Sequence, residues 1–262
     1  MKKLSIIIPA YNEEETLLEI LSRVIAAPLE GLCKEIIIID DCSTDNTGKI
    51  IEDLKKDRKK IFLGKTTSSN DQKYSEPEFV FLKNDNNSGK GYSIRKGIEK
   101  STGDIILIQD ADLEYNPFEY KKLLQPITDG RADVVYGSRF LGETRRVLYF
   151  WHTVGNTFLT LFSNIFTDLN MSDMETCYKA FKSNIIKKIK LKSNRFGFEP
   201  EVTAKLAKIK ARIYEVPISY SGRTYEQGKK ITWKDGFHAI YAIFKYNVFP
   251  GDFIHKSETE SV

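Results

Sequence analysis

The sequence predicts an α/β fold in which helices sandwich a mostly parallel, Rossmann-like sheet. Short apolar runs alternate with stretches whose apolar residues recur at helical spacing, and this rhythm is typical of parallel sheets. Several runs are almost continuous isoleucine, as expected of strands that are buried on both faces. The chain has 262 residues and is 41% hydrophobic, which suits one domain with a substantial core.

The alternating pattern runs through the first half of the chain. Strands are expected at residues 4–8, 35–39, 79–82, 104–108 and 132–136. Helices are expected at residues 13–27, 45–54, 89–100 and 117–125. Residues 64–78 are polar and show no period, so they are expected to form a surface loop.

The second half of the chain is richer in aromatic residues. Residues 147–169 and 237–249 mix aromatic and aliphatic side chains with scattered polar ones, which predicts amphipathic helices near the C-terminus. We therefore expect an α/β domain over residues 1–220, followed by a loop, an amphipathic helix and a polar tail over residues 221–262.

Composition narrows the classes of function. The 40 Lys and Arg nearly balance the 36 Asp and Glu, and the net charge of +4 gives no argument for nucleic acid, although it agrees with weak attraction to an anionic membrane. Cys33, Cys42 and Cys177 match neither a disulfide framework nor a zinc site. The first apolar run is too short for a signal peptide and none is long enough to span a bilayer, so a cytoplasmic protein without a transmembrane helix is expected.

Two carboxylates, Asp110 and Asp112, follow the strand expected at residues 104–108. Ligands of parallel sheets gather at the carboxyl ends of the strands. Carboxylate oxygens suit Mg²⁺ or Mn²⁺, which can bridge to the oxygens of a diphosphate. An acidic turn that only caps the next helix has the same pattern, so this motif by itself leaves both interpretations open.

Two further polar turns are expected at the same edge of the sheet. Residues 9–14 (PAYNEE) follow the first strand, and residues 40–47 (DDCSTDNT) follow the second. An aspartate in such a turn can hydrogen-bond a base or a ribose, and the helix N-termini beyond it favour anions. Helix capping is the alternative role of these side chains.

Together with residues 87–91 (NSGKG), these motifs resemble the family 2 glycosyltransferases of the GT-A type over residues 4–140. The resemblance implies a nucleotide-sugar donor and a divalent cation, Mg²⁺ or Mn²⁺, held by Asp110 and Asp112 with Glu114 as a further ligand. An exposed lysine at a helix start is the alternative for Lys90. The residues implied to surround the donor are Pro9, Ala10, Tyr11, Glu13, Asp40, Asp41, Lys90, Asp110 and Ala111.

Later segments are similar to the polyprenyl-phosphate glycosyltransferases, the dolichol-phosphate mannosyltransferase and glucosyltransferase group. They are residues 137–140 (GSRF), 173–179 (DMETCYK), 215–218 (EVPI) and 223–231 (RTYEQGKKI). Cationic side chains suit phosphate oxygens, although ordinary surface charge is the alternative for each. The residues expected at the acceptor phosphate are Arg139, Arg146, His152, Asn156, Arg223 and Lys229.

One departure from that group concerns the acceptor. Related enzymes are expected to use an Arg and a Ser four residues apart, where this chain has His152 and Asn156 on one helical face. Asn can donate to a phosphate, and His does so best when protonated, near its ordinary pKa of about 6.5. The departure leaves the class of acceptor open, and a half-buried His on an aromatic helix is the alternative.

A polyprenyl acceptor has to be met at the bilayer, so a peripheral position on the cytoplasmic membrane face is expected. Trp151, Phe158, Phe162 and Phe166 share a helical face that can enter the membrane interface, although core packing uses the same spacing. The oligomeric state is left open, a homodimer included. The basic residues expected to help on anionic lipid are Arg145, Arg146, Lys229, Lys230 and Lys234.

The predicted reaction is inverting transfer of a sugar from a UDP- or GDP-sugar to a polyprenyl phosphate. A phosphate monoester is largely dianionic at neutral pH and needs no strong base, so Asp173 would orient Arg or His side chains. With a saccharide or other hydroxyl acceptor, Asp173 would be the general base. A non-catalytic nucleotide-sugar-binding protein is the further alternative. The residues expected to carry catalysis are Asp112, Asp173, Arg139, Arg223 and Lys229.

Overall fold

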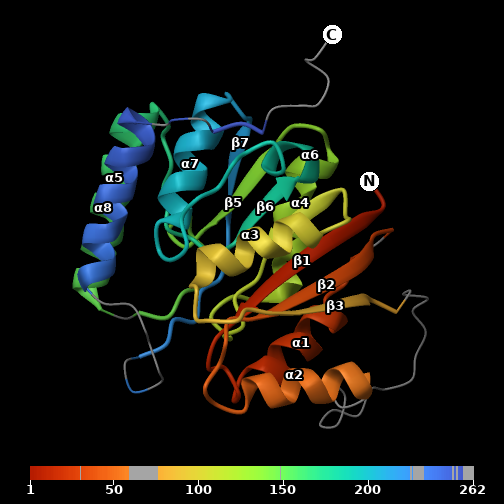
Figure 1. Ribbon diagram of the computed structural model, residues 1–262. Coiled ribbons are helices and arrows are strands. Elements are labelled where there is room, and N and C mark those ends of the chain that lie inside the picture. Colours follow the sequence, from red (N-terminus) through yellow and green to blue (C-terminus); the bar gives the residue numbers. More distant parts are fainter. Residues whose placement is uncertain are drawn as a thin grey trace.

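A seven-stranded sheet in the order β3-β2-β1-β4-β6-β5-β7 forms the centre of the fold (Figure 1). The structure is a computed structural model and describes residues 1–29, 31–58, 76–147, 149–224, 226, 233–249, 251 and 253–255. Strand β6 runs antiparallel to β4 and β5, and the other neighbouring strands are parallel. The predicted α/β class and the mostly parallel sheet are therefore confirmed.

The elements that were expected in the first half of the chain are all present, with ends that differ by a few residues. The strands are β1 (Lys3–Ala10), β2 (Cys33–Asp40), β3 (Glu78–Lys83), β4 (Ile105–Ile108), β5 (Val134–Ser138), β6 (Lys179–Lys182) and β7 (Ile213–Pro217). The helices are α1 (Leu17–Ala26), α2 (Thr47–Lys56), α3 (Lys90–Lys100), η2 (Pro117–Glu119), α4 (Tyr120–Thr128), α5 (Phe150–Thr167), α6 (Ser183–Ile186), α7 (Phe198–Lys208) and α8 (Trp233–Val248).

Four elements were not predicted, namely β6, α6, β7 and α7. Strand β6 has the sequence KAFK, in which Lys179 is fully buried because its amine donates to the carbonyl oxygens of Met174 and Thr176. Its ammonium also lies 4.6 Å from the centre of the Tyr136 ring. With lysine at a buried position, the sequence of β6 lacks the apolar pattern from which a strand is predicted. Of the expected 64–78 loop, residues 64–75 lie outside the described residues.

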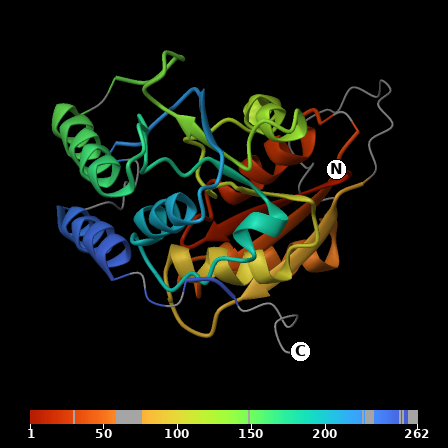
Figure 2. The same cartoon turned by 90° about the horizontal axis from the view of Figure 1, so that it is seen from above.

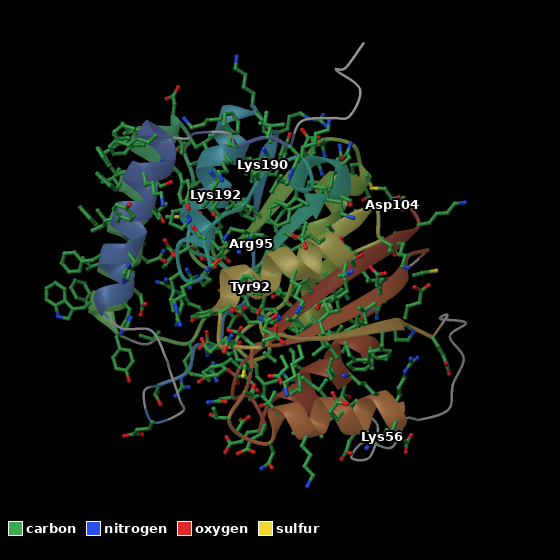
Figure 3. All side chains as sticks on the ribbon, in the orientation of Figure 1. Lys56, Tyr92, Arg95, Asp104, Lys190 and Lys192 are labelled. Carbon is green, nitrogen blue, oxygen red and sulfur yellow. The ribbon has the colours of Figure 1, made fainter. Side chains whose placement is uncertain are left out.

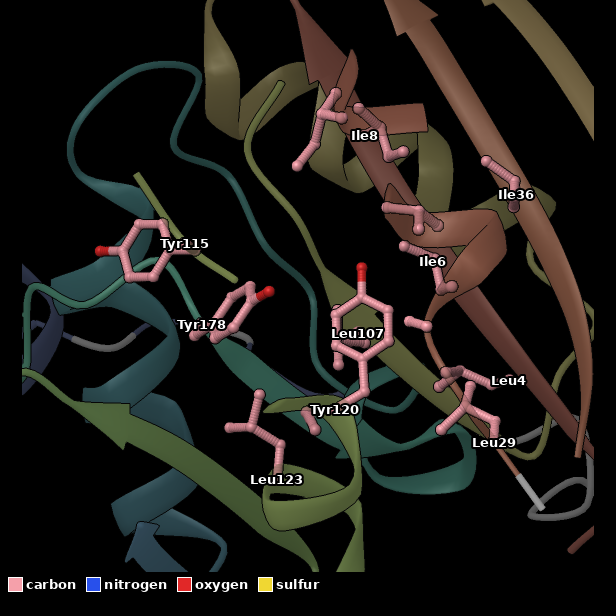
Figure 4. Packing of buried hydrophobic residues seen from close by; sticks show 14 of the residues in the cluster. Leu4, Ile6, Ile8, Leu29, Ile36, Leu107, Tyr115, Tyr120, Leu123 and Tyr178 are labelled. Carbon is pink, nitrogen blue, oxygen red and sulfur yellow. The ribbon is translucent and has the colours of Figure 1, made fainter. Parts of the chain in front are cut away.

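The sheet separates two apolar cores because successive side chains of a strand point to opposite faces. In β1, Ile6 packs on the side of α1, α2 and α4, whereas Ile7 packs on the side of α3 and α7. The isoleucines of residues 36–39 are all fully buried, as expected of strands covered on both faces. Figure 4 shows the rings of Tyr115, Tyr120 and Tyr178 packed beside the apolar side chains of the first core.

Helices α5 and α8 lie side by side at one end of the molecule, beyond α7 (Figures 1 and 2). The edge of the Phe166 ring on α5 meets the Phe244 ring on α8, with centroids 6.1 Å apart. The opposite side of α8 packs on α7 through Ala242, Tyr246 and Ala204. Within the described ranges, none of the helices combines the length and the apolar character needed to cross a membrane.

Asp133 joins three strands at the far end of the sheet. It precedes β5, accepts from Arg212 before β7 (2.8 Å) and from Lys182 of β6 (2.9 Å). The Arg212 hydrogen bonds are the main cause that holds the pKa of Asp133 well below its ordinary value of 3.8, with Lys182 adding to it against the effect of burial.

A depressed carboxylate pKa stabilises the fold above its unfolded value and loses this effect as the pH falls through the folded value. We therefore expect Asp133→Asn to lower the free energy of unfolding at pH 7. The difference from wild type should shrink steadily below about pH 4. Urea unfolding at several pH values measures the difference in free energy of unfolding between wild type and Asp133→Asn. A difference that stays constant from pH 7 to pH 2 would contradict the assigned role of the Asp133 carboxylate.

Candidate active site

The carboxyl ends of β1, β2 and β4 are neighbours in the sheet, which brings their turns together. Asn12 and Cys42 adopt left-handed backbone with φ of 52° and 59°, an uncommon state for residues other than glycine. The first two turns are joined by hydrogen bonds. The backbone N–H of Thr44 donates to Asn12 Oδ1 (2.8 Å), and that of Glu13 donates to Thr47 Oγ1 (2.8 Å).

Asp41 ties the end of β2 to the start of α3. Its carboxylate accepts from the backbone N–H groups of Ser88 (2.9 Å) and Gly89 (2.7 Å) and from the side chain of Asn84 (2.7 Å). Gly89 has φ of 94°, and a Cβ there would meet the Asn194 carbonyl oxygen at 2.5 Å. The predicted NSGKG segment is therefore positioned by Asp41, and it needs glycine at residue 89.

The other donor residues predicted at these turns lie at the same edge. Asp40 is 2% exposed and accepts from the backbone N–H of Ser43 (2.9 Å). Both aspartates thus support the turns through backbone donors, and their contact with a base or ribose stays a prediction. Ala10 and Ala111 are buried, and Pro9 and Tyr11 are half-buried.

Lys90 and Asp110 form an ion pair of 2.6 Å at the end of β4. The ammonium also donates to Cys177 Sγ (2.7 Å) and lies 3.8 Å from Glu199 Oε1. Burial opposes the charged form of both partners. The attraction between them outweighs it, so the pKa of Lys90 is raised above its ordinary value and that of Asp110 is lowered. Lys90 is therefore part of the site and is not an exposed lysine.

Asp112 lies in the same cluster and is paired with Arg223. The guanidinium donates to Asp112 Oδ2 (2.9 Å) and to Glu13 Oε2 (3.2 Å), and its Nε lies 3.7 Å from Glu114 Oε1. Burial first, and then the charges of Asp110 and Glu114, raise the pKa of Asp112 to about 8. Arg223 was expected at a phosphate, and the structure places it on the carboxylates.

The carboxylates fit a divalent cation that shares its coordination with a diphosphate. Mg²⁺ is usually held by one or two carboxylates together with phosphate oxygens and water. Asp110 and Asp112 meet that need, and the pKa of Asp112 is raised by burial first and then by neighbouring negative charge, which a bound cation would offset. Among the described residues no group of three acidic, His or Cys side chains is arranged to hold a metal ion, and this includes the predicted set of Asp110, Asp112 and Glu114.

Arg139 forms a second centre beside the carboxylates. Its Nε and Nη2 donate to the two oxygens of Asp173, both at 2.7 Å, and Nη2 also donates to Asn156 Oδ1 of α5 (3.0 Å). Burial opposes the guanidinium charge, but Asp173 outweighs it and raises the pKa of Arg139. The Tyr220 ring covers the guanidinium at 5.2 Å. A half-buried guanidinium that is held in place by hydrogen bonds is suited to an anionic oxygen group.

The remaining predicted acceptor residues are Arg146, His152 and Lys229. Arg146 donates to the Gly222 carbonyl oxygen (3.2 Å), and the His152 ring lies 5.3 Å from the Tyr149 ring. Lys229 lies outside the described residues. The prediction missed Glu175, Cys177 and Glu199 as site residues. The first two lie inside the DMETCYK motif, which was the available signal, and nothing local marks Glu199.

Comparisons with known proteins agree with this geometry. Residues 5–190 match glycosyl transferase family 2, and the chain belongs to that family. It is 23% identical over 253 residues to the dolichol-phosphate mannosyltransferase of Pyrococcus furiosus, covering 95% of this chain and 65% of that protein. The chain thus spans just under two thirds of that relative. It is 28% identical to the undecaprenyl-phosphate mannosyltransferase of Micrococcus luteus, covering 85% of each.

The fold has solved counterparts. Glucosyl-3-phosphoglycerate synthase from Mycobacterium tuberculosis, in complex with Mn²⁺ and UDP-glucose, superposes with a TM-score of 0.68 at 16% identity, covering 96% of this chain and 81% of that one. This likeness establishes the shared architecture and confirms the expected GT-A fold.

Removal of the Asp173 carboxylate should destabilise the protein through Arg139. A buried charge that loses its partner costs about 3–5 kcal/mol, so we expect Asp173→Ala to lower the free energy of unfolding by about 3 kcal/mol. Urea denaturation measures it. The control is the double variant Arg139→Met with Asp173→Leu, which removes both charges and should recover most of the loss. Equal losses in both variants would show that the pairing is not the cause.

Proposed function

We propose that this protein transfers a sugar from a UDP- or GDP-sugar to a polyprenyl phosphate at a membrane surface, with inversion at the anomeric carbon. The observation that carries the proposal is the place of Arg139, a half-buried guanidinium bound to α5, at the sheet edge that also holds Asp110 and Asp112. Two relatives, named for mannosyl transfer with dolichol phosphate and undecaprenyl phosphate, support the same acceptor class.

The donor side is assigned to the carboxylates. Asp110 and Asp112 would hold Mg²⁺ or Mn²⁺, which when bound supplies positive charge to the leaving diphosphate. Lys90 sits against Asp110 with its ammonium fixed, so it can contact the diphosphate or the sugar without a large loss of side-chain freedom. Arg223 adds a second cation, which is paired with Asp112.

The acceptor side is assigned to Arg139. Asp173 is fully buried, and both of its oxygens accept hydrogen bonds from the Arg139 guanidinium. A carboxylate used in this way is poorly placed to take a proton from a hydroxyl acceptor. A phosphate acceptor needs no such base, because it is largely dianionic at neutral pH. The arrangement therefore favours Asp173 as the residue that orients Arg139.

The helix pair α5 and α8 supplies the proposed membrane face, and side chains project from it away from the sheet (Figure 3). Phe150 and Trp151 are 70% and 77% exposed. Of the predicted lipid-facing residues, Phe158 is exposed and Phe162 is half-buried, and Phe166 is 36% exposed although its ring meets Phe244 of α8. The other large apolar side chains exposed on the two helices are Val154, Leu161, Ile165, Phe237, Tyr241, Phe244 and Val248.

Positive charge lies beside this apolar face. A cavity of about 330 Å³ opens between α8 and residues 192–197, and basic side chains contribute to its lining. Lys192 is visible near α8 in Figure 3. Cations next to exposed aromatic residues suit an anionic bilayer. The positively charged residues of the lining are Lys192, Arg195 and Lys245, and the lining also includes His238 and one acid, Asp235.

The metal assignment is tested with Asp112→Asn. Loss of the charged ligand should reduce turnover by about 100-fold or more, because charge on the leaving diphosphate is no longer neutralised. The assay offers a panel of UDP- and GDP-sugars with Mg²⁺ or Mn²⁺ and a short polyprenyl phosphate, and it measures lipid-linked sugar.

The matched control is Asp129→Asn, which removes an exposed carboxylate paired with Arg131 and should leave turnover unchanged. Normal metal-dependent turnover in Asp112→Asn would sink the metal assignment. Donor binding by the wild type without transfer to any acceptor would instead support a non-catalytic binding protein.

The membrane assignment is tested with the double variant Phe150→Ser and Trp151→Ser. An apolar side chain of this size contributes about 1.5–3 kcal/mol when it is fully removed from water. Loss of two such side chains should therefore weaken binding to anionic vesicles by about tenfold or more. Vesicle co-sedimentation measures the affinity. Phe118→Ser, which removes a 53% exposed aromatic side chain outside the helix pair, is the control. Equal binding by both variants would place the membrane contact elsewhere.

A further inference from the structure

Glu175 carries a buried oxygen that has no partner. Its Oε1 is closed off from solvent and accepts no hydrogen bond from any described residue, and the hydroxyl of Thr176 is in the same condition. Polar atoms that are shut off from water are nearly always hydrogen-bonded, so an exception calls for an explanation, and a ligand that bonds the group is one such explanation. The reaction as assigned so far makes no use of Glu175.

The position of Glu175 along the chain places it between the two halves of the site. Two residues before it, Asp173 holds Arg139. Two residues after it, Cys177 accepts from Lys90, which pairs with Asp110. The segment between α5 and β6 therefore runs from the proposed acceptor phosphate site to the proposed donor diphosphate site. In a transfer between those two phosphates, the sugar occupies the interval.

Glu199 adds a second carboxyl group to the interval between Lys90 and Arg139. It comes from the first turn of α7, is 4% exposed and lies 3.8 Å from the Lys90 ammonium. Burial first, and then the charge of Glu199, raise the pKa of Glu175 to about 8. A carboxylic acid that keeps its proton can both donate and accept, which matches the two kinds of hydrogen bond that a sugar hydroxyl forms.

We propose that Glu175, with Glu199 beside it, hydrogen-bonds the hydroxyl groups of the transferred hexose and thereby selects which nucleotide-hexose the protein accepts. The inference rests on the proposed function, because it takes the interval between Lys90 and Arg139 as the place of the sugar. It gives the unpartnered Oε1 of Glu175 a hydrogen-bond partner. Cys177 and Lys90 remain on the diphosphate side of the sugar.

The experiment compares the binding of a nucleotide alone with that of the same nucleotide carrying a hexose. Isothermal calorimetry with Mn²⁺ measures UDP against UDP-glucose and UDP-galactose, and GDP against GDP-mannose. In Glu175→Ala the nucleotide alone should bind within about twofold of wild type. The extra affinity contributed by the preferred hexose should fall about tenfold or more, which is the loss of a hydrogen bond to a buried polar group.

Deoxy-hexose donors make the test specific. In the wild type, one deoxy position should weaken binding, and in Glu175→Ala the same deoxy donor should bind as well as its parent. Glu175→Gln keeps the shape of the side chain and should lose less, and it serves as the test variant if Glu175→Ala does not fold. Glu143→Gln, which alters an acid paired with Lys122 at the surface, is the control.

Two outcomes would overturn the inference. One is a hexose contribution in both Glu175 variants that stays within about twofold of wild type. The other is an equal loss for nucleotide and nucleotide-hexose, which indicates a structural role. Because these are binding measurements, they decide the role of Glu175 even if the wild type transfers no sugar to polyprenyl phosphate. A wild type that binds no nucleotide-hexose would overturn both proposals.

Discussion

Charge neutralisation at the carboxyl edge of the sheet is the constraint on which the site depends. The parallel arrangement of β1, β2 and β4 forces acidic turns together in a place largely closed to water, where an unpaired carboxylate is costly. Asp40 and Asp41 are satisfied by neutral N–H donors, most of them backbone, whereas Asp110 and Asp112 pair with cations from other parts of the chain. Lys90 comes from the start of α3 to Asp110, and Arg223 comes from the segment after β7 to Asp112. These two ion pairs attach the start of α3 and the segment after β7 to the turn that follows β4.

The same ion pairs can be exchanged for contacts with ligands. Asp112 can be neutralised either by Arg223 or by a divalent cation, because both bring positive charge to the same carboxylate. A guanidinium that gives up this carboxylate needs another anion, and a diphosphate offers matching oxygens. The expected phosphate role of Arg223 and its observed contact with Asp112 are therefore compatible. The contact with Asp112 is what the structure contains, and the phosphate role of Arg223 stays a prediction for a ligand-bound site.

Helix α5 connects the chemistry to the proposed membrane face. Its inward side contributes Asn156, which bonds both to Arg139 and to Asp173. Its outward side presents Phe150 and Trp151 to solvent. A helix that is polar where it meets the sheet edge and aromatic on its free side would place the proposed acceptor phosphate site next to the proposed membrane face. The departure at residues 152 and 156 is partly explained, because Asn156 supports the guanidinium.

The amino-acid sequence by itself determined the α/β class, most of the first-half elements and the order of the motifs, because isoleucine runs, helical periods and turn residues are local properties. Only the tertiary structure decided which charges meet. Arg223 and Glu13 are 210 residues apart in the chain, and no period or spacing relates them. The buried Lys179 hid strand β6, and the unpartnered oxygen of Glu175 exists only once the loops have packed. Contacts between remote loops depend on how the whole chain closes, so a pattern along the sequence cannot contain them.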